Sequence, residues 1–136
     1  MRSILPCFIL LAACSQGREP ASSIATGTFA GEGRDRLCIA GKPGNYRAGI
    51  IAYAAGDVNC SANGRVEIVN GQVDLVPRGE GDCRIPLTIE GSGVRIGELP
   101  AACSYYCGPG ASMAGKSFGR TNAGDQAADL AGDPLC

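Results

Sequence analysis

Histidine and tryptophan are both absent from the 136 residues of this chain, and phenylalanine occurs only three times. Without histidine a Ser-His-Asp triad is impossible, and a metal site would have to use cysteine and carboxylate ligands. The charged residues are 12 basic and 13 acidic, with a formal net charge of −1, and they form no basic run. The sequence therefore predicts no nucleic-acid partner, no metal and no cofactor.

Hydrophobic runs long enough to cross a membrane are also lacking. Residues 4–13 form a run of ten mostly apolar residues, whereas a spanning helix needs about 20. This run follows a short start that contains Arg2 and ends in two alanines, which is the pattern of a secretory signal peptide. We expect residues 1–13 to be removed from an exported chain.

The end of this run, Leu11-Ala12-Ala13-Cys14, resembles the lipobox of bacterial lipoproteins. The resemblance implies that Cys14 carries a diacylglyceryl group, that the chain is cut before it, and that the new amine is acylated. Ser15 follows instead of Asp, which in that family implies the outer membrane, with the periplasmic face of the inner membrane as the alternative. The competing interpretation is an ordinary secreted protein with a cysteine after its cleavage site.

Six further cysteines remain in the exported part: Cys38, Cys60, Cys83, Cys103, Cys107 and Cys136. An even set in an exported chain predicts a disulfide framework, with up to three bridges among fifteen connectivities. Of these connectivities we favour Cys38–Cys60, Cys83–Cys103 and Cys107–Cys136.

The body of the chain favours β-structure, because its 21 glycines separate many short apolar runs. After a polar tether at residues 14–23 we expect one domain at residues 24–136. It would be a small antiparallel β-barrel or sandwich, with short helices or turns at residues 100–107, 111–118 and 123–130. The expected strands cover residues 24–30, 36–40, 47–54, 65–69, 72–76, 84–90 and 93–98.

Two residue pairs predict hairpins with a defined register. Asn70-Gly71 favours a type I′ turn, and Gly91-Ser92 favours a type II′ turn with glycine first. The first turn puts Val66, Ile68, Val73 and Leu75 on one face, and the second pairs Ile89 with Val94 and Leu87 with Ile96.

Two residues in these hairpins conflict with regular pairing. Glu67 would lie opposite Asp74, an unfavourable pair that Arg65 or Arg78 would offset. Pro86 cannot donate a hydrogen bond, so we expect its strand to be at a sheet edge or bulged.

The most distinctive local feature is Cys103-Ser104-Tyr105-Tyr106-Cys107. We interpret its cysteines as structural half-cystines, since a metal site would need more ligands and a redox pair is typically Cys-x-x-Cys. Tyr105, Tyr106 and Pro109 form either a recognition surface or part of the core.

Catalysis finds little support in the sequence. A carboxylate pair could come from Glu32, Asp35, Asp57, Glu67, Asp74, Glu80 or Asp82, but none of these lies in a recognised motif.

Residues 103–111 and the closing Asp-Leu-Ala-Gly-Asp-Pro-Leu-Cys resemble small Cys-rich lipoproteins of proteobacteria. The resemblance implies a membrane-anchored binding or envelope-maintenance module, with an envelope protein or glycan as partner. The alternatives are an enzyme that acts on cell-wall glycan and a purely structural lipoprotein.

Overall fold

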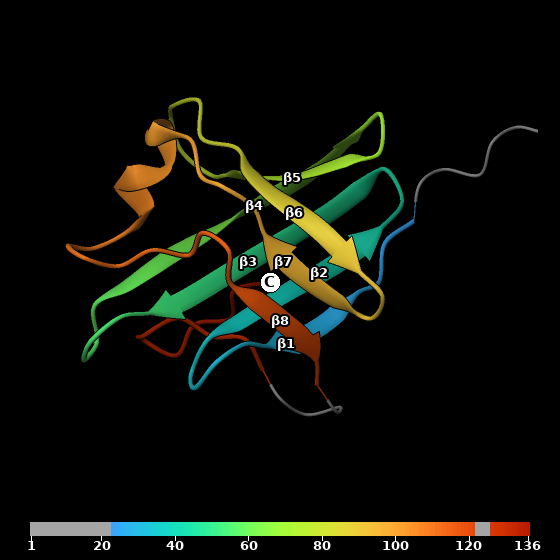
Figure 1. Cartoon of the computed structure of the whole chain (residues 1–136). Helices are drawn as coiled ribbons and strands as arrows, with labels where there is room; N and C mark the ends of the chain where they lie inside the picture. The colour runs from blue at the N-terminus through green and yellow to red at the C-terminus, as the bar shows by residue number, and fades with distance from the viewer. Residues whose placement is uncertain (1–22, 122–125) are drawn as a thin grey trace, which may run out of the picture.

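A computed structural model describes residues 23–121 and 126–136. In it, eight antiparallel strands follow one another in chain order and form a closed barrel, with the first strand paired to the last (Figure 1). The strands are β1 (Gly27–Ala30), β2 (Arg36–Lys42), β3 (Asn45–Tyr53), β4 (Asn59–Val69), β5 (Gln72–Pro77), β6 (Ile85–Glu90), β7 (Gly93–Ile96) and β8 (Ser117–Arg120). The prediction of a small antiparallel β-barrel is confirmed. The predicted signal segment and Cys14 lie outside the described residues.

Alternation along each strand fills the barrel with apolar side chains. Residues that pair across neighbouring strands point to the same face of the sheet. One such row, which faces inward across β1 to β4, consists of Phe29, Leu37, Ile50 and Ala62. The same cluster contains Leu75, Ile85, Ile96, Met113 and Phe118, each at most 2% exposed. Side chains therefore occupy the interior, as expected for a barrel of eight strands.

Both predicted hairpins are confirmed in register. In the first, Val69 pairs with Gln72 and Val66 with Leu75, and Asn70 and Gly71 have φ of 50° and 78°, as a type I′ turn requires. In the second, Ile89 pairs with Val94 and Leu87 with Ile96.

Pro86 does not mark an edge strand, because β6 pairs with β5 on one side and with β7 on the other. The carbonyl of Pro86 accepts a hydrogen bond from Gly97 N at 2.9 Å, just beyond the last β7 residue. In an antiparallel ladder the N and C=O of one residue face the same neighbour. The amide hydrogen bond that Pro86 cannot make would therefore belong to the β6–β7 ladder, at the position where that ladder ends.

The C-terminal segment, residues 126–136, packs on the outside of the barrel. Leu135 joins Cys38, Ile51 and Ala127 in a second small apolar cluster, separate from the interior. A Cβ atom on Gly49 would lie 2.6 Å from both Cβ and the carbonyl oxygen of Leu135. The outer face of β3 is therefore covered at this point, and glycine allows the close approach.

All six cysteines predicted to form disulfides do so, but two of the three predicted pairs are wrong. The bridges are Cys38–Cys136, Cys60–Cys107 and Cys83–Cys103, and only the last was predicted. Cys38 belongs to the outer cluster and Cys60 to the interior cluster. They lie on opposite faces of the barrel wall, so they cannot bond to each other.

Of the three segments predicted to form short helices or turns, one contains a helix in the described chain. Residues 101–106 form the 3-10 helix η1 (Ala101–Tyr106). Residues 111–118 instead run into β8, because Phe118 pairs with Val94 and fills the interior. In the described part of residues 123–130, from residue 126 onward, the chain is irregular.

Candidate functional site

The two ends of the barrel are built differently. At one end, which we call the hairpin end, two-residue turns at residues 43–44, 70–71 and 91–92 connect the strands, and residues 23–26 lead into β1. At the other, the loop end, the connections are residues 31–35, 54–58, 78–84 and 97–116. Figure 1 shows η1 at the loop end, opposite the hairpin turns. Binding residues are commonly carried by such loops on a rigid scaffold.

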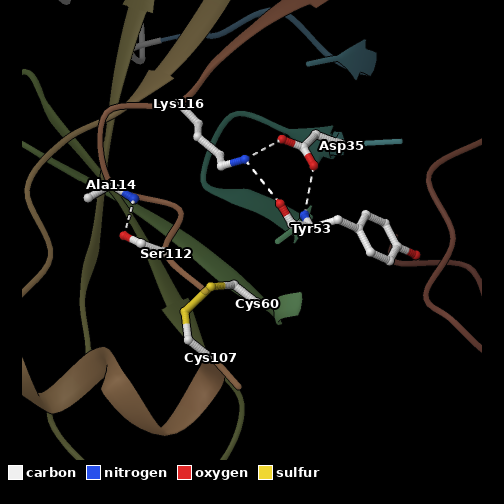
Figure 2. The surroundings of a disulfide bond; sticks show 7 residues. All are labelled: Asp35, Tyr53, Cys60, Cys107, Ser112, Ala114 and Lys116. Atoms are coloured by element: carbon white, nitrogen blue, oxygen red, sulfur yellow. Dashed lines mark hydrogen bonds and ion pairs between the residues drawn. A yellow bond between two sulfur atoms is a disulfide. The ribbon is translucent and has the colours of Figure 1, made fainter. Parts of the chain in front are cut away.

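Helix η1 is fixed to the barrel by two disulfides. Cys103 is fully buried and bonds to Cys83 in the β5–β6 loop. Cys107, directly after the helix, bonds to Cys60 in β4 and forms an isolated antiparallel bridge with it (Figure 2). The short helix therefore has two covalent attachments within five residues, which limits the conformations of the side chains between them.

Of the two tyrosines between these cysteines, Tyr106 is partly buried and Tyr105 is exposed. The hydroxyl of Tyr106 donates to the carbonyl oxygen of Arg78 at 3.2 Å, and its ring meets that of Tyr105 edge to face, with centroids 5.2 Å apart. Tyr105 itself is 87% exposed. Of the predicted recognition surface, Tyr105 and Pro109 are exposed, whereas Tyr106 packs against the β5–β6 loop and supports its neighbour.

A cavity of about 380 Å³ lies between η1 and the segment that follows it. The chain from Leu99 to Ser112 carries no charged residue, so the cavity wall is uncharged. The residues that line it are Leu99, Pro100, Ala101, Cys103, Ser104, Cys107, Gly108, Ala111 and Ser112. This wall suits an apolar or aromatic group rather than an ion.

A buried ion pair joins two other loops of the same end. Oδ2 of Asp35, which is 3% exposed, accepts from Lys116 Nζ at 2.7 Å, and Oδ1 accepts from Tyr53 N at 2.7 Å (Figure 2). Both carboxylate oxygens are thus occupied. The arrangement suits a structural tie between β2, β3 and the segment before β8. No local sequence pattern predicts it, because Lys116 is 81 residues from Asp35.

Three of the other candidate carboxylates, Glu67, Asp74 and Asp57, are bound by arginines. Glu67 and Asp74 are opposite each other on the outer wall, and Arg84 binds both, at 3.2 Å for Asp74. Hydrogen bonds from Arg84 and then Arg65 lower the pKa of Glu67 below its ordinary value of 4.5. Glu67 therefore remains ionised at neutral pH and is not suited to act as a general acid.

Arg84 replaces Arg78 as the residue that offsets the Glu67–Asp74 pair, and Arg65 contributes as predicted. Asp57 is bound by Arg34, whose guanidinium also stacks 3.8 Å above the ring of Tyr53. Glu32 shares a loop-end cavity of about 370 Å³ with Asp35 and Lys116, and Glu80 and Asp82 lie in the β5–β6 loop.

Within residues 23–121 and 126–136, no cluster of three or more acidic, cysteine or histidine side chains could hold a metal ion. The same part of the chain contains no helix long and apolar enough to cross a membrane. Comparison with family models, curated proteins and solved structures finds no match.

Proposed function

We propose that this chain is a lipid-anchored binding module of the bacterial envelope, in which the loop end of the barrel recognises an envelope protein. The observation that carries the proposal is Tyr105, 87% exposed on a helix held by two disulfides. A rigid exposed aromatic side chain provides a large contact area at little entropic cost on binding. The adjacent uncharged cavity offers a place for an apolar side chain of the partner.

The anchor in this proposal is lipid on Cys14, which places the domain at the periplasmic face of the outer membrane. Two or three acyl chains on one cysteine hold a protein durably, whereas a single chain binds only marginally. Cys14→Ala is expected to move the protein from the detergent-dependent fraction to the soluble fraction and to abolish its palmitate labelling. Unchanged fractionation of this variant would exclude the anchor.

The binding site is tested by photo-crosslinking in cells with the full chain. A photoreactive phenylalanine analogue at position 105 is expected to give one discrete protein adduct. The matched control is position 69, because Val69 is also an exposed apolar residue, at 57%, but lies at the hairpin end. Adducts of the same size from both positions, or none from position 105, would contradict the proposal.

A substitution then measures how much Tyr105 contributes to binding. Tyr105→Ala is expected to reduce recovery of the crosslinked partner, captured through a second analogue at Ser104, by at least about tenfold, as for a typical hot spot. Leu130→Ala is the control, since Leu130 is similarly apolar and 55% exposed but lies on the C-terminal segment. An unchanged yield with Tyr105→Ala would place the binding surface elsewhere.

A further inference from the structure

The two ends of the barrel differ in the sign of their unpaired charges. Among the described residues, the acidic side chains without an ion-pair partner in the barrel loops all lie at the loop end. They are Glu32, Glu80, Asp82 and Glu98. The C-terminal segment adds Asp129 and Asp133 on the outer wall.

Unpaired basic side chains show the opposite distribution. Lys42 ends β2 beside the first hairpin turn, Arg120 ends β8, and Arg47 lies near the start of β3, and all three are exposed. The guanidinium of Arg120 extends over Gly27, where a Cβ atom would lie 3.6 Å from Nη2. Arg78 begins the loop of residues 78–84 and lines a cavity on the outer wall together with Arg47 and Cys136.

The acidic residues nearest the hairpin turns are neutralised by arginines. Glu90 pairs with Arg95 at 3.1 Å, and Glu67 and Asp74 share Arg84, with Arg65 on Glu67. These groups add no net charge. The described part of the hairpin end is therefore positive, and the loop end is negative.

The chain enters the barrel at the positive end. Residues 23–26 precede β1 there, and Ile24 N donates to the hydroxyl of Tyr46 at 3.2 Å. The nine residue steps from Cys14 to Ser23 span at most about 32 Å even when fully extended. A lipid on Cys14 would thus keep the entry to β1 within about 32 Å of the headgroups, so the hairpin end can reach them.

We propose that the hairpin end docks on anionic phospholipid headgroups and thereby points Tyr105 away from the membrane. This inference rests on the proposed lipid anchor. An anionic surface attracts Lys42, Arg47 and Arg120 and repels the acidic loop end within roughly one Debye length, about 8–10 Å. The resulting orientation presents the recognition surface to partners beyond the membrane.

The chain has only two lysines, Lys42 at the hairpin end and Lys116 at the loop end, and they make the orientation measurable. The full lipidated chain is reconstituted in phosphatidylcholine vesicles with or without 30% phosphatidylglycerol (about one lipid in three). Amine labelling by a water-soluble ester is then followed by mass spectrometry. Lys42 is expected to react about fivefold more slowly in the anionic vesicles, with Lys116 unchanged as the internal reference.

Neutralising variants test whether charge is the cause. Arg120→Gln and Arg47→Gln are each expected to lower the docked-to-undocked ratio about fivefold, as is high salt. Arg34→Gln is the matched control, because Arg34 is an exposed arginine in the loop of residues 31–35 at the loop end, and it should leave the protection of Lys42 intact. Equal labelling of Lys42 in both kinds of vesicle, or equal effects of Arg34→Gln and Arg120→Gln, would overturn the proposal.

Vesicle flotation separates failure of this inference from failure of the anchor. A chain that floats with neutral vesicles is anchored, so equal labelling of Lys42 then rejects the docking alone. A chain that does not float with neutral vesicles lacks the anchor. In that case, flotation with anionic vesicles together with protection of Lys42 still supports docking through the basic surface. If the chain does not float with anionic vesicles either, docking through the basic surface is rejected.

Discussion

The ammonium group of Lys116 lies 2.7 Å from Oδ2 of Asp35, and this contact ties the segment before β8 to the residue that precedes β2. Asp35 is nearly inaccessible, whereas the Lys116 side chain is 28% exposed. The pair therefore stabilises the closure of the barrel across its two terminal regions.

Removing the lysine should leave a buried carboxylate with one oxygen unpaired. We expect Lys116→Met to lower the free energy of unfolding by about 2 kcal/mol. This loss is smaller than that for breaking a fully buried ion pair, because Lys116 is partly hydrated. Urea denaturation with disulfides intact measures this. Asp57→Asn breaks the exposed pair with Arg34 and should cost less than about 1 kcal/mol; equal losses would contradict a special role for Asp35.

The ion cluster on β4, β5 and β6 should make stability depend on pH. The pKa of Glu67 is lowered in the folded state, chiefly by Arg84. Its contribution is therefore present above the unfolded value and is lost as the pH falls through the folded pKa. We expect the melting temperature to fall as the pH drops below 4.5, and Glu67→Gln to reduce that fall.

The control for the pH experiment is Glu80→Gln. Glu80 has no ion-pair partner in the described chain, so this variant should retain the acid-induced loss. A Glu67→Gln profile that coincides with that of Glu80→Gln would show that the cluster does not contribute.

Glycine at position 49 should be required for packing of the C-terminal segment. Gly49→Ala places a methyl group 2.6 Å from the backbone and side chain of Leu135, so we expect a loss of about 2 kcal/mol in unfolding free energy. Gly119→Ala is the control, because a Cβ atom there meets nothing within 4 Å. Hydrogen exchange of Leu135 N, which donates to Ala127 O, should accelerate only in Gly49→Ala.

The three disulfides should differ in their contributions to stability and function. Replacing both cysteines of the Cys38–Cys136 bridge, which closes 98 residues, should cost about 5 kcal/mol, the most of the three by loop entropy. It should leave crosslinking at position 105 unchanged. Loss of Cys83–Cys103, with a separation of 20 residues, should cost about 3 kcal/mol. It should also weaken that crosslinking, because η1 then keeps only the attachment at Cys107. The reverse order of crosslinking effects would argue against a preorganised site.

Local signals in the sequence predicted the hairpins well. Asn70-Gly71 and Gly91-Ser92 define their turns within a few residues, and alternation then sets the register of the flanking strands. The strand β8 was missed because its four residues contain a single large apolar side chain, Phe118, after a segment rich in alanine and serine. Only pairing with β1 and β7 makes this segment a strand.

The disulfide connectivity depended on tertiary placement that no local pattern records. Cys107 reaches Cys60 because η1 folds back against β4, and Cys136 reaches Cys38 because the C-terminal segment crosses the outer wall. Spacing along the chain favoured neighbours in sequence instead. For the two adjacent tyrosines, the sequence could not decide which one packs inward; Tyr106 does so, and Tyr105 is exposed.

Barrel closure also bears on how this domain behaves when many copies share a surface. Within residues 23–121 and 126–136, each of the eight strands has a hydrogen-bonded neighbour on both sides, so the described sheet has no edge strand. Strand addition, a common way for β-proteins to aggregate or to capture extended peptides, is closed to the folded barrel. Contacts between copies crowded in one plane would therefore be made through side chains and loops rather than by adding one strand to another.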